Sequence, residues 1–372
     1  MPFHHGVRVN EINTGARPMR ALAAAVLGLV ATASDADAAV FPLGVPVLVT
    51  DLSAAIEDAG ELGTLASSLE AIRDQCEPLV VVVRVDDAGD AAADSAAVIA
   101  GINKLVDAES LVGVRPKIIG APGLDGAVAT GALATVAAKL RGFAYAACGT
   151  SASVADLVTY RSGFGQRELM LIWPSFMRGG GVIARTVARA MGLRARIDAE
   201  QGVQKSLSNV TVNGVTGLSR PVFFDLQDPS CEAVQVNLND VTTLVQMNGF
   251  RFWGSRTCSD DPLFAFEPTV RVGQTLRDTI AGAMAWAIDK PVSPGLAKDI
   301  VEMINADFRA HKSAGVILGG EAWLDTTTNT VNGIKSGRLT IDYDYTVPPP
   351  LEDLTLNQRI TDRYIAESFG VA

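Results

Sequence analysis

Between residues 40 and 200, short apolar segments alternate with longer segments of helical composition. The apolar segments are 41–51, 78–87, 116–123, 143–149 and 168–174. The helical segments are 53–60, 64–76, 92–111, 126–142, 155–164 and 183–202. Residues 78–87 (PLVVVVRVDD) form an almost continuous apolar run, which is typical of a parallel strand buried on both faces. The alternation predicts βαβ units and an α/β fold with a mainly parallel sheet and flanking helices.

The pattern changes after residue 200. Asn248 and Gly249 lie between two apolar segments, which predicts a β-hairpin with a type I′ turn. Segments 274–292 and 295–312 are helical in composition, and segments 315–324 and 337–347 have strand patterns. Helices followed by strands predict a C-terminal α+β region.

The last strand pattern has a clear period of two. The apolar positions are Ile341, Tyr343, Tyr345 and Val347, and the polar positions between them are Asp342, Asp344 and Thr346. This alternation predicts a half-buried strand with the tyrosines on the apolar side and the aspartates facing outward. Three consecutive prolines, 348–350, end the strand and stiffen the link that follows.

Both ends of the chain have the composition of arms. In the polar segment 1–20, Val7 and Val9 alternate with Arg8 and Asn10, which indicates a short strand. After the prolines, a further strand is indicated by Leu354, Leu356 and Ile360, and a helix is possible for 361–369. Segment 1–20 has a net charge of +2, whereas segment 341–372 has a net charge of −4. The two arms therefore carry opposite charge.

Size and charge restrict the class of protein. The chain has 372 residues, 48% of them hydrophobic, which suits two domains or one large domain with additions. With 31 Lys and Arg against 41 Asp and Glu, the net charge is −10. Such a chain is a poor candidate for binding nucleic acid or anionic lipid over its whole surface. We expect neither nucleic-acid binding nor membrane insertion.

Residues 19–39 imitate a secretion signal, with an arginine, an apolar run and an Ala-x-Ala pattern. The run begins about 20 residues into the chain, and Asp35 and Asp37 occupy the would-be cleavage region. The run is also shorter than the roughly 20 residues that span a bilayer. We interpret it as the first buried strand or helix of the main domain.

The residues that usually perform catalysis are sparse and scattered. The histidines are His4, His5 and His311, and the cysteines are Cys76, Cys148, Cys231 and Cys258. They show no metal-ligand spacing and no CxxC pair, which favours reduced, mostly buried thiols and a structural role for His311 at a helix end. The sequence also lacks a Gly-x-Ser-x-Gly elbow and a Gly-Lys P-loop. We expect no cofactor, no metal and no catalytic residue.

Two segments merit a second interpretation. Gly179–Gly181 precedes a helical segment and could bind an anion through backbone N–H groups, although a surface loop is favoured because no lysine completes a phosphate site. Asp260 and Asp261 could bind a metal or act in acid/base chemistry. Because Pro262 follows, capping of the next element is favoured.

Stretches spread along the whole chain resemble one family, the tail sheath proteins of contractile-tailed bacteriophages, especially temperate enterobacterial myophages and the related pyocin particles. These stretches are 4–13 (HHGVRVNEIN), 32–38, 41–51, 63–72, 166–174 (QRELMLIWP), 192–202 (GLRARIDAEQG), 206–217, 249–264 (GFRFWGSRTCSDDPLF), 286–291 and 341–364 (IDYDYTVPPPLEDLTLNQRITDRY). The loop near Gly179–Gly181 looks different and short.

The resemblance implies a structural subunit that polymerises as a helical sheath around the tail tube and contracts to drive the tube through the host envelope. It implies an N-terminal assembly arm (1–20), an outer, subtilisin-like α/β domain (21–266), an inner α+β assembly domain (267–347) and a C-terminal arm (348–372). The implied partners are further copies of the chain, the tube protein, and the baseplate and tail terminator proteins. The implied location is the virion tail, assembled in the host cytoplasm.

The arms also support strand addition between subunits on their own chemistry. Neither arm can bury its apolar alternation, and ladder hydrogen bonds from a neighbour would solve this. The candidate contact residues are Val7, Arg8, Val9, Asp342, Tyr343, Asp344, Tyr345, Leu354 and Leu356. Two alternatives remain open here: an α/β enzyme or nucleotide-binding protein, and a secreted protein cleaved near Ala38.

Overall fold

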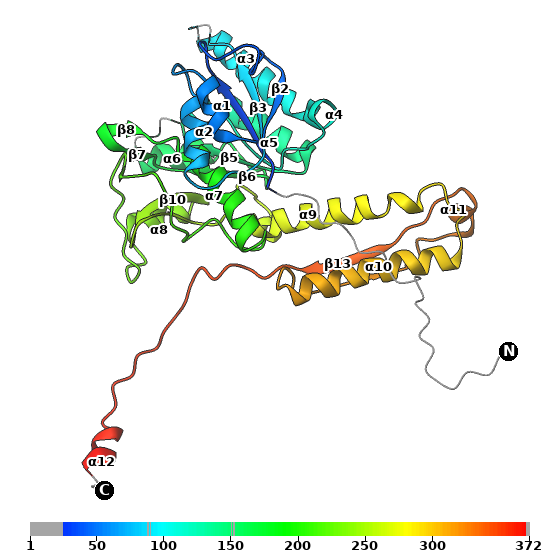
Figure 1. Cartoon of the computed structure of the whole chain (residues 1–372). Coiled ribbons are helices and arrows are strands. Elements are labelled where there is room, and N and C mark those ends of the chain that lie inside the picture. The colour runs from blue at the N-terminus through cyan, green and yellow to red at the C-terminus, as the bar shows by residue number, and fades with distance from the viewer. Residues whose placement is uncertain (1–24, 88, 90, 150, 152, 370–372) are drawn as a thin grey trace, which may run out of the picture.

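In a computed structural model of the chain, residues 25–369 are described except positions 88, 90, 150 and 152. The chain forms a large α/β body, from which helix α9 (Glu267–Ala283) leads into a second, elongated layer. The C-terminal segment then runs away from both (Figure 1). Three of the expected contact residues, Val7, Arg8 and Val9, lie outside the described residues.

An eight-stranded sheet organises the body, in the order β11-β10-β6-β5-β4-β1-β3-β2. Its strands are β1 (Leu27–Thr32), β2 (Pro46–Val49), β3 (Val80–Val85), β4 (Ile118–Gly120), β5 (Phe143–Ala147), β6 (Leu169–Ile172), β10 (Val241–Gln246) and β11 (Phe250–Trp253). The six inner strands are parallel, and the edge strands β2 and β11 are antiparallel to their neighbours. The expected mainly parallel sheet is confirmed.

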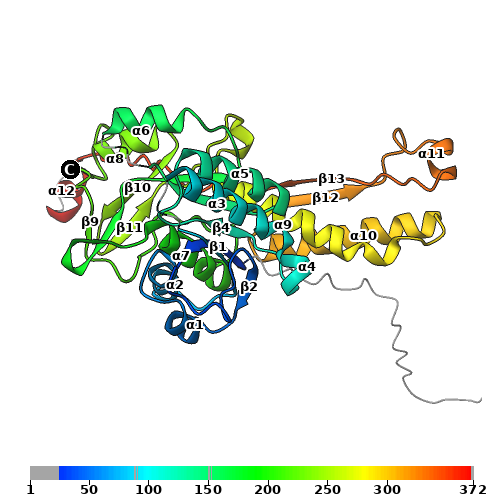
Figure 2. The same cartoon turned by 90° about the horizontal axis from the view of Figure 1, so that it is seen from above.

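Helices cover both faces of the sheet (Figure 2). One face carries α1 (Leu52–Asp58), α2 (Leu65–Arg73) and α7 (Thr186–Glu200). The other carries α3 (Ala91–Lys104), α5 (Ala127–Leu140) and α6 (Val154–Arg161), with the shorter α4 (Ala108–Val112) and α8 (Glu232–Asn237) nearby. Covering both faces explains why the strands are continuously apolar.

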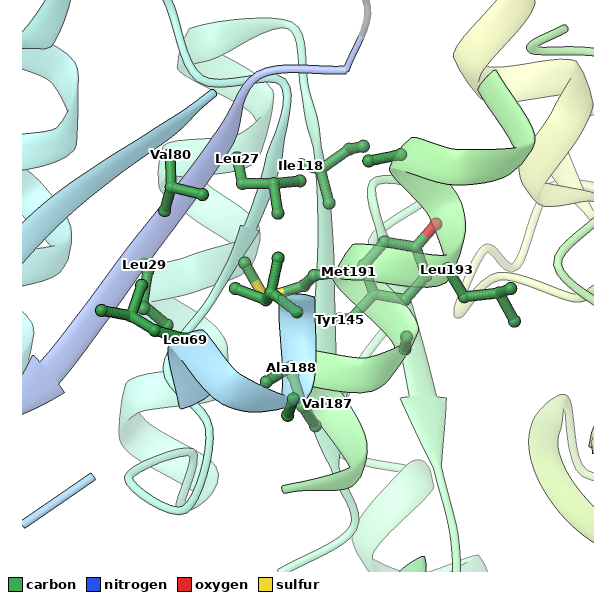
Figure 3. Packing of buried hydrophobic residues seen from close by; sticks show 14 of the residues in the cluster. Leu27, Leu29, Leu69, Val80, Ile118, Tyr145, Val187, Ala188, Met191 and Leu193 are labelled. Atoms are coloured by element: carbon green, nitrogen blue, oxygen red, sulfur yellow. The ribbon is translucent and has the colours of Figure 1, made fainter. Parts of the chain in front are cut away.

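Alternate residues of β1 and β3 belong to the two opposite cores. Leu27 and Leu29 point to the α2/α7 face, where they pack with Leu69 and Met191 (Figure 3). Val30 belongs to the opposite core, with residues of α3 and α5. The described part of the apolar run that imitates a secretion signal thus includes β1, a fully buried strand between β3 and β4. A cleavage near Ala38 would remove this inner strand, so the secreted alternative conflicts with the fold.

Close approach of α7 to the sheet depends on Gly120 in β4. A methyl group at this position would come to 2.7 Å from the sulfur of Met191 and 3.1 Å from a methyl of Val187. Both contacts are tighter than ordinary packing distances, so a larger residue would force the side chains of Met191 and Val187 on α7 to shift.

Two local expectations need correction. The β10–β11 hairpin forms, and Asn248 and Gly249 both have positive φ. However, Gln246 pairs with Phe250, so the connection has three residues and not the two of a type I′ turn. Gly179–Gly181 does not open the helix: it turns β7 (Phe176–Arg178) into β8 (Val182–Ile183), and β9 (Gly217–Leu218) completes this small sheet.

The second layer is built from α9, α10 (Pro294–Ser313) and the antiparallel pair β12 (Gly319–Trp323) and β13 (Asp342–Thr346). Helix α11 (Val331–Lys335) lies at its far end, and α12 (Arg363–Phe369) ends the C-terminal segment (Figure 1). Ser293 caps α10 by accepting the Leu296 N–H, with Pro294 in the first turn.

Asp125 predicts a pH dependence of stability. Its carboxylate is buried near the carboxyl ends of β4 and β5 and accepts the Ala147 N–H at 2.6 Å, and burial raises its pKa from 3.8 to about 6. A carboxyl group whose pKa is higher in the folded than in the unfolded state binds its proton more tightly in the folded state. The free energy of unfolding therefore rises as the pH falls through the folded-state pKa. The free energy of unfolding of dilute chain should therefore be about 1.4 kcal/mol higher at pH 5 than at pH 7.5.

Urea unfolding at the two pH values measures this effect. Asp125→Asn, which cannot ionise, is the control and should lose most of the increment. An equal pH dependence in both chains would show that Asp125 is not the source.

Candidate assembly surfaces

The second layer has a hydrophobic core of its own. Helices α9 and α10 contribute Val272, Leu276, Ile280, Ile300, Ile304 and Phe308. The strand region adds Ile317 and Ala322, with Tyr343 and Tyr345 packed against them. This core buries one face of the β12–β13 pair and leaves the other face without a covering element among the described residues.

The alternation along β13 is as expected. The Tyr343 ring lies 6.0 Å from the Phe308 ring, and 6.4 Å from the Tyr345 ring in a stacked arrangement. Tyr345 reaches α9 at Gly273, where a methyl group would come to 2.6 Å from its hydroxyl. Asp344 is exposed on the opposite face.

The uncovered face of this pair is acidic. Glu321 is directly opposite Asp344, and Trp323 is opposite Asp342. Like charges directly opposite each other disfavour a strand pair. The charges on this face therefore do not stabilise the pairing of β12 with β13.

The outer edges of the two strands differ. The two-stranded sheet has no further strand within the described part of the chain, so both outer edges lack a strand partner. On β12, Asn305 of α10 satisfies Ala322: it accepts the Ala322 N–H at 2.8 Å and donates to the Ala322 carbonyl at 3.0 Å. Asn305 thus occupies backbone groups on the edge of β12 with which a further strand could otherwise pair. The edge of β13 is the more open of the two.

Within the described part of the chain, the apolar side chains of the C-terminal segment are exposed. Leu354 is 65% exposed, Leu356 81% and Ile360 95%. Residues 347–361 contain no strand or helix in this chain, so the strand expected around Leu354 and Leu356 is not formed within the chain. The short helix α12 follows, and it lies far from the body in Figure 1. Exposed apolar residues on an extended segment favour pairing with another chain.

One charged contact holds the root of this segment. The Arg256 guanidinium donates to the Glu352 carboxylate from Nε at 3.2 Å and from Nη2 at 2.9 Å. Hydrogen bonds with Glu352 and charge–charge attraction raise the pKa of Arg256, although burial opposes the charge. The bond is thus a charge-assisted one between two half-exposed groups.

A buried ionic network joins α9 to the body. Arg271 of α9 donates to both Asp198 oxygens, at 2.8 and 2.6 Å, and Arg194 of α7 also pairs with Asp198 at 2.8 Å. Arg194 lies 3.4 Å from Glu267, whose carboxylate accepts the Tyr145 hydroxyl. All five side chains are buried. Burial opposes ionisation of Asp198, yet the two arginines hold its pKa below the usual range.

A second ionic contact lies further along the same helix. Asp278 of α9 pairs with Lys117, just before β4, and with Arg141, which follows α5. Gln274 also donates to the Gly142 carbonyl at 2.9 Å. Helix α9 is therefore fixed to the body at two places along its length.

The candidate chemical sites have structural explanations. Asp261 accepts the Leu263 N–H and caps a 3₁₀ turn, as expected, and Cys76, Cys148, Cys231 and Cys258 are free thiols. His311 lies 3.3 Å from Asp307, one turn earlier in α10. Within residues 25–369, apart from the four omitted positions, no cluster of His, Cys, Asp and Glu has the arrangement of a metal site. The helices of the same residues are too short or too polar to cross a bilayer.

One apolar pocket lies where the body meets the second layer. Its volume is about 260 Å³, and its lining includes Val203, Val272, Leu276, Val316 and His311. It contains no assembled set of catalytic groups.

Comparison with known proteins decides the family. Three models match the chain: the tail sheath protein Gp18 domain III N-terminal region (25–85), the phage tail sheath protein central domain (97–258) and the phage tail sheath C-terminal domain (259–361). The tail sheath protein of Escherichia phage P2 is 48% identical over 384 residues, which cover 98% of this chain and 97% of the relative. The chain belongs to the phage tail sheath family. It is a structural sheath protein and not an enzyme.

Further relatives support the sheath assignment. The major tail sheath protein of Serratia phage KSP20 is 41% identical, covering 99% of this chain and 98% of the relative. The contracted helical sheath of the anti-feeding prophage has a TM-score of 0.75 at 20% identity, covering 95% of this chain and 98% of the other. The contracted sheath complex of the extracellular injection system PVC has a TM-score of 0.74 at 16% identity, covering 98% and 99%. These two structures share the fold of the sheath chain.

Sequence reasoning missed several contacts of this sheath chain. No sequence pattern indicates that Arg256 contacts Glu352, because the two residues are 96 positions apart. The same holds for Asn305 and its partner 17 positions later, Ala322. Glu267 and Arg271 are four residues apart and resemble an exposed helical pair. Only the fold shows that they are buried.

Proposed function

We propose that the chain polymerises into a helical sheath by strand addition between subunits, and that contraction of this sheath drives a tail tube through the host envelope. The observation that supports it most is the combination of an open β13 edge with an extended C-terminal segment whose leucines are exposed. An edge with free N–H and C=O groups and a segment with unpaired alternation complement each other. The oppositely charged segment 1–20, with Arg8, is the second proposed arm.

The proposed layout keeps the boundaries expected from the sequence. Residues 1–20 and 348–372 are the two arms, 21–266 the outer, subtilisin-like domain and 267–347 the inner assembly domain. The acidic face of β12–β13 would meet a basic arm or the tube surface. The tube, the baseplate and the tail terminator are the proposed partners besides further copies, in a virion tail assembled in the host cytoplasm.

The two faces of β13 provide a test of this proposal. Replacing Tyr343 and Tyr345 with serine should lower the free energy of unfolding by roughly 2–5 kcal/mol, because aromatic packing on Phe308 and α9 is lost. Replacing Asp342 and Asp344 with lysine should leave folding nearly unchanged but impair polymerisation, since these carboxylates face away from the core.

The measurements are thermal melting and electron microscopy of purified protein. The wild-type chain should form hollow striated cylinders. The lysine variant should have the melting temperature of the wild type but form few cylinders or none. Two outcomes would contradict the proposal: wild-type protein that never forms cylinders, or an aspartate variant that is more damaging to folding than the tyrosine variant.

A further inference from the structure

We infer that Arg256 and Glu352 act as a releasable anchor that fixes the root of the C-terminal arm and so sets where the arm can reach a second copy. This inference rests on the proposed strand addition, and it assigns positioning residues that lie outside the strands themselves. Glu352 follows β13 by six residues and comes after the three prolines.

Contacts with the body hold the Arg256 side chain in place. The Arg256 Nη1 lies 3.4 Å from Asp240, and Asp240 is itself paired with the buried Arg161 at 3.2 Å. The Arg256 guanidinium also lies over the ring of Phe266, 5.5 Å from its centre. A guanidinium fixed on two sides presents its remaining donors, Nε and Nη2, in one direction, and Glu352 takes both.

Between Glu352 and α12 the described chain makes no hydrogen bond or ion pair with the body: those of residues 353–362 join them to the first turn of α12. Before α12, Glu352 is thus the last residue of the described segment that is bonded to the body. The Arg256 and Glu352 side chains are 41% and 36% exposed. A half-exposed ion pair is weak and salt-sensitive, which allows it to open when the arm must change direction.

Loss of the anchor lengthens the free part of the arm. With the anchor, about ten residues (353–362) lie between the fixed root and α12; without it, about sixteen (347–362) do. The effective concentration of a tethered group falls as roughly the −3/2 power of tether length, so we expect an about two-fold slower addition of subunits.

The test compares Glu352→Gln with Asp353→Asn. Both changes remove one negative charge at adjacent exposed positions, but Asp353 makes no hydrogen bond or ion pair within the described part of the chain. For the measurement, Ser162 and Ser368 are replaced by cysteine and carry nitroxide labels, and Cys76→Ser removes the native thiol that is not fully buried. Pulsed EPR of the dilute monomer then reports the distance from the body to α12. Glu352→Gln should broaden this distribution and slow cylinder growth about two-fold, and Asp353→Asn should do neither.

Each remaining outcome decides the inference. An unchanged distance distribution in Glu352→Gln would overturn the anchor, whereas a broader distribution with an unchanged growth rate would overturn its role in assembly. Arg256→Gln combined with Glu352→Gln should match the single variants, and additive effects would also overturn it. The EPR result does not require polymerisation, so failure of the wild-type chain to form cylinders would count against the proposed function and not against the anchor.

Discussion

Replacing Arg271 with methionine should lower the free energy of unfolding by about 3–5 kcal/mol, because it leaves the buried Asp198 with only one cationic partner. Methionine replaces the unbranched apolar stem of the arginine and lacks only the guanidinium end, so most of the loss should come from the uncompensated charge. Chemical denaturation of the monomer measures the effect.

An exposed pair provides the matched control. Arg309 pairs with Glu302 on α10, and both side chains are more than half exposed. The same substitution, Arg309→Met, should change stability by less than about 1 kcal/mol. If the two variants lost equal stability, the buried network would not be what holds α9 to the body.

The network also bears on how a sheath subunit can move. Tyr145 and Arg194 belong to the body, whereas Glu267 and Arg271 lie in the first two turns of α9. Breaking these contacts within one subunit while the body stays folded would leave buried charges without partners, which is costly. We propose that weaker, half-exposed contacts such as Arg256–Glu352 open instead.

Truncation after Asp353 should abolish polymerisation while leaving the free energy of unfolding unchanged within about 0.5 kcal/mol. The removed leucines contribute little burial to the folded chain, since Leu354 and Leu356 are exposed. Electron microscopy and urea unfolding of the truncated chain check the two halves of this expectation. Deletion of residues 1–15 should likewise block assembly.

Leu226→Ser is the control for the truncation. Leu226 is as exposed as Leu354 but lies in a loop of the body, so its loss should leave cylinder formation intact. Cylinders formed by the truncated chain would show that the C-terminal arm is dispensable. A large loss of stability would instead show that the arm packs on its own body.

The sequence alone was sufficient for the class of fold. The apolar run around Val80–Val85 predicted a strand buried on both faces, and the segments between the strands predicted helices. Period-two alternation likewise placed Tyr343 on the core side of β13. These predictions succeed because side-chain periodicity and burial depend on neighbours along the chain.

Tertiary structure decided what depends on residues far apart in the sequence. The strand order, with β1 between β4 and β3, follows from pairing between distant segments. The three-residue turn before Phe250 follows from the register in which β10 and β11 pair. Two ion pairs likewise join distant residues. Glu267 is buried against Arg194, 73 positions earlier, and Arg256 contacts Glu352, 96 positions later. Charged residues carry no periodic signal that separates a buried ion pair from a solvated one. For Glu267 and Arg194, only the packing of α7, α9 and the sheet removes the water that would otherwise screen the two charges.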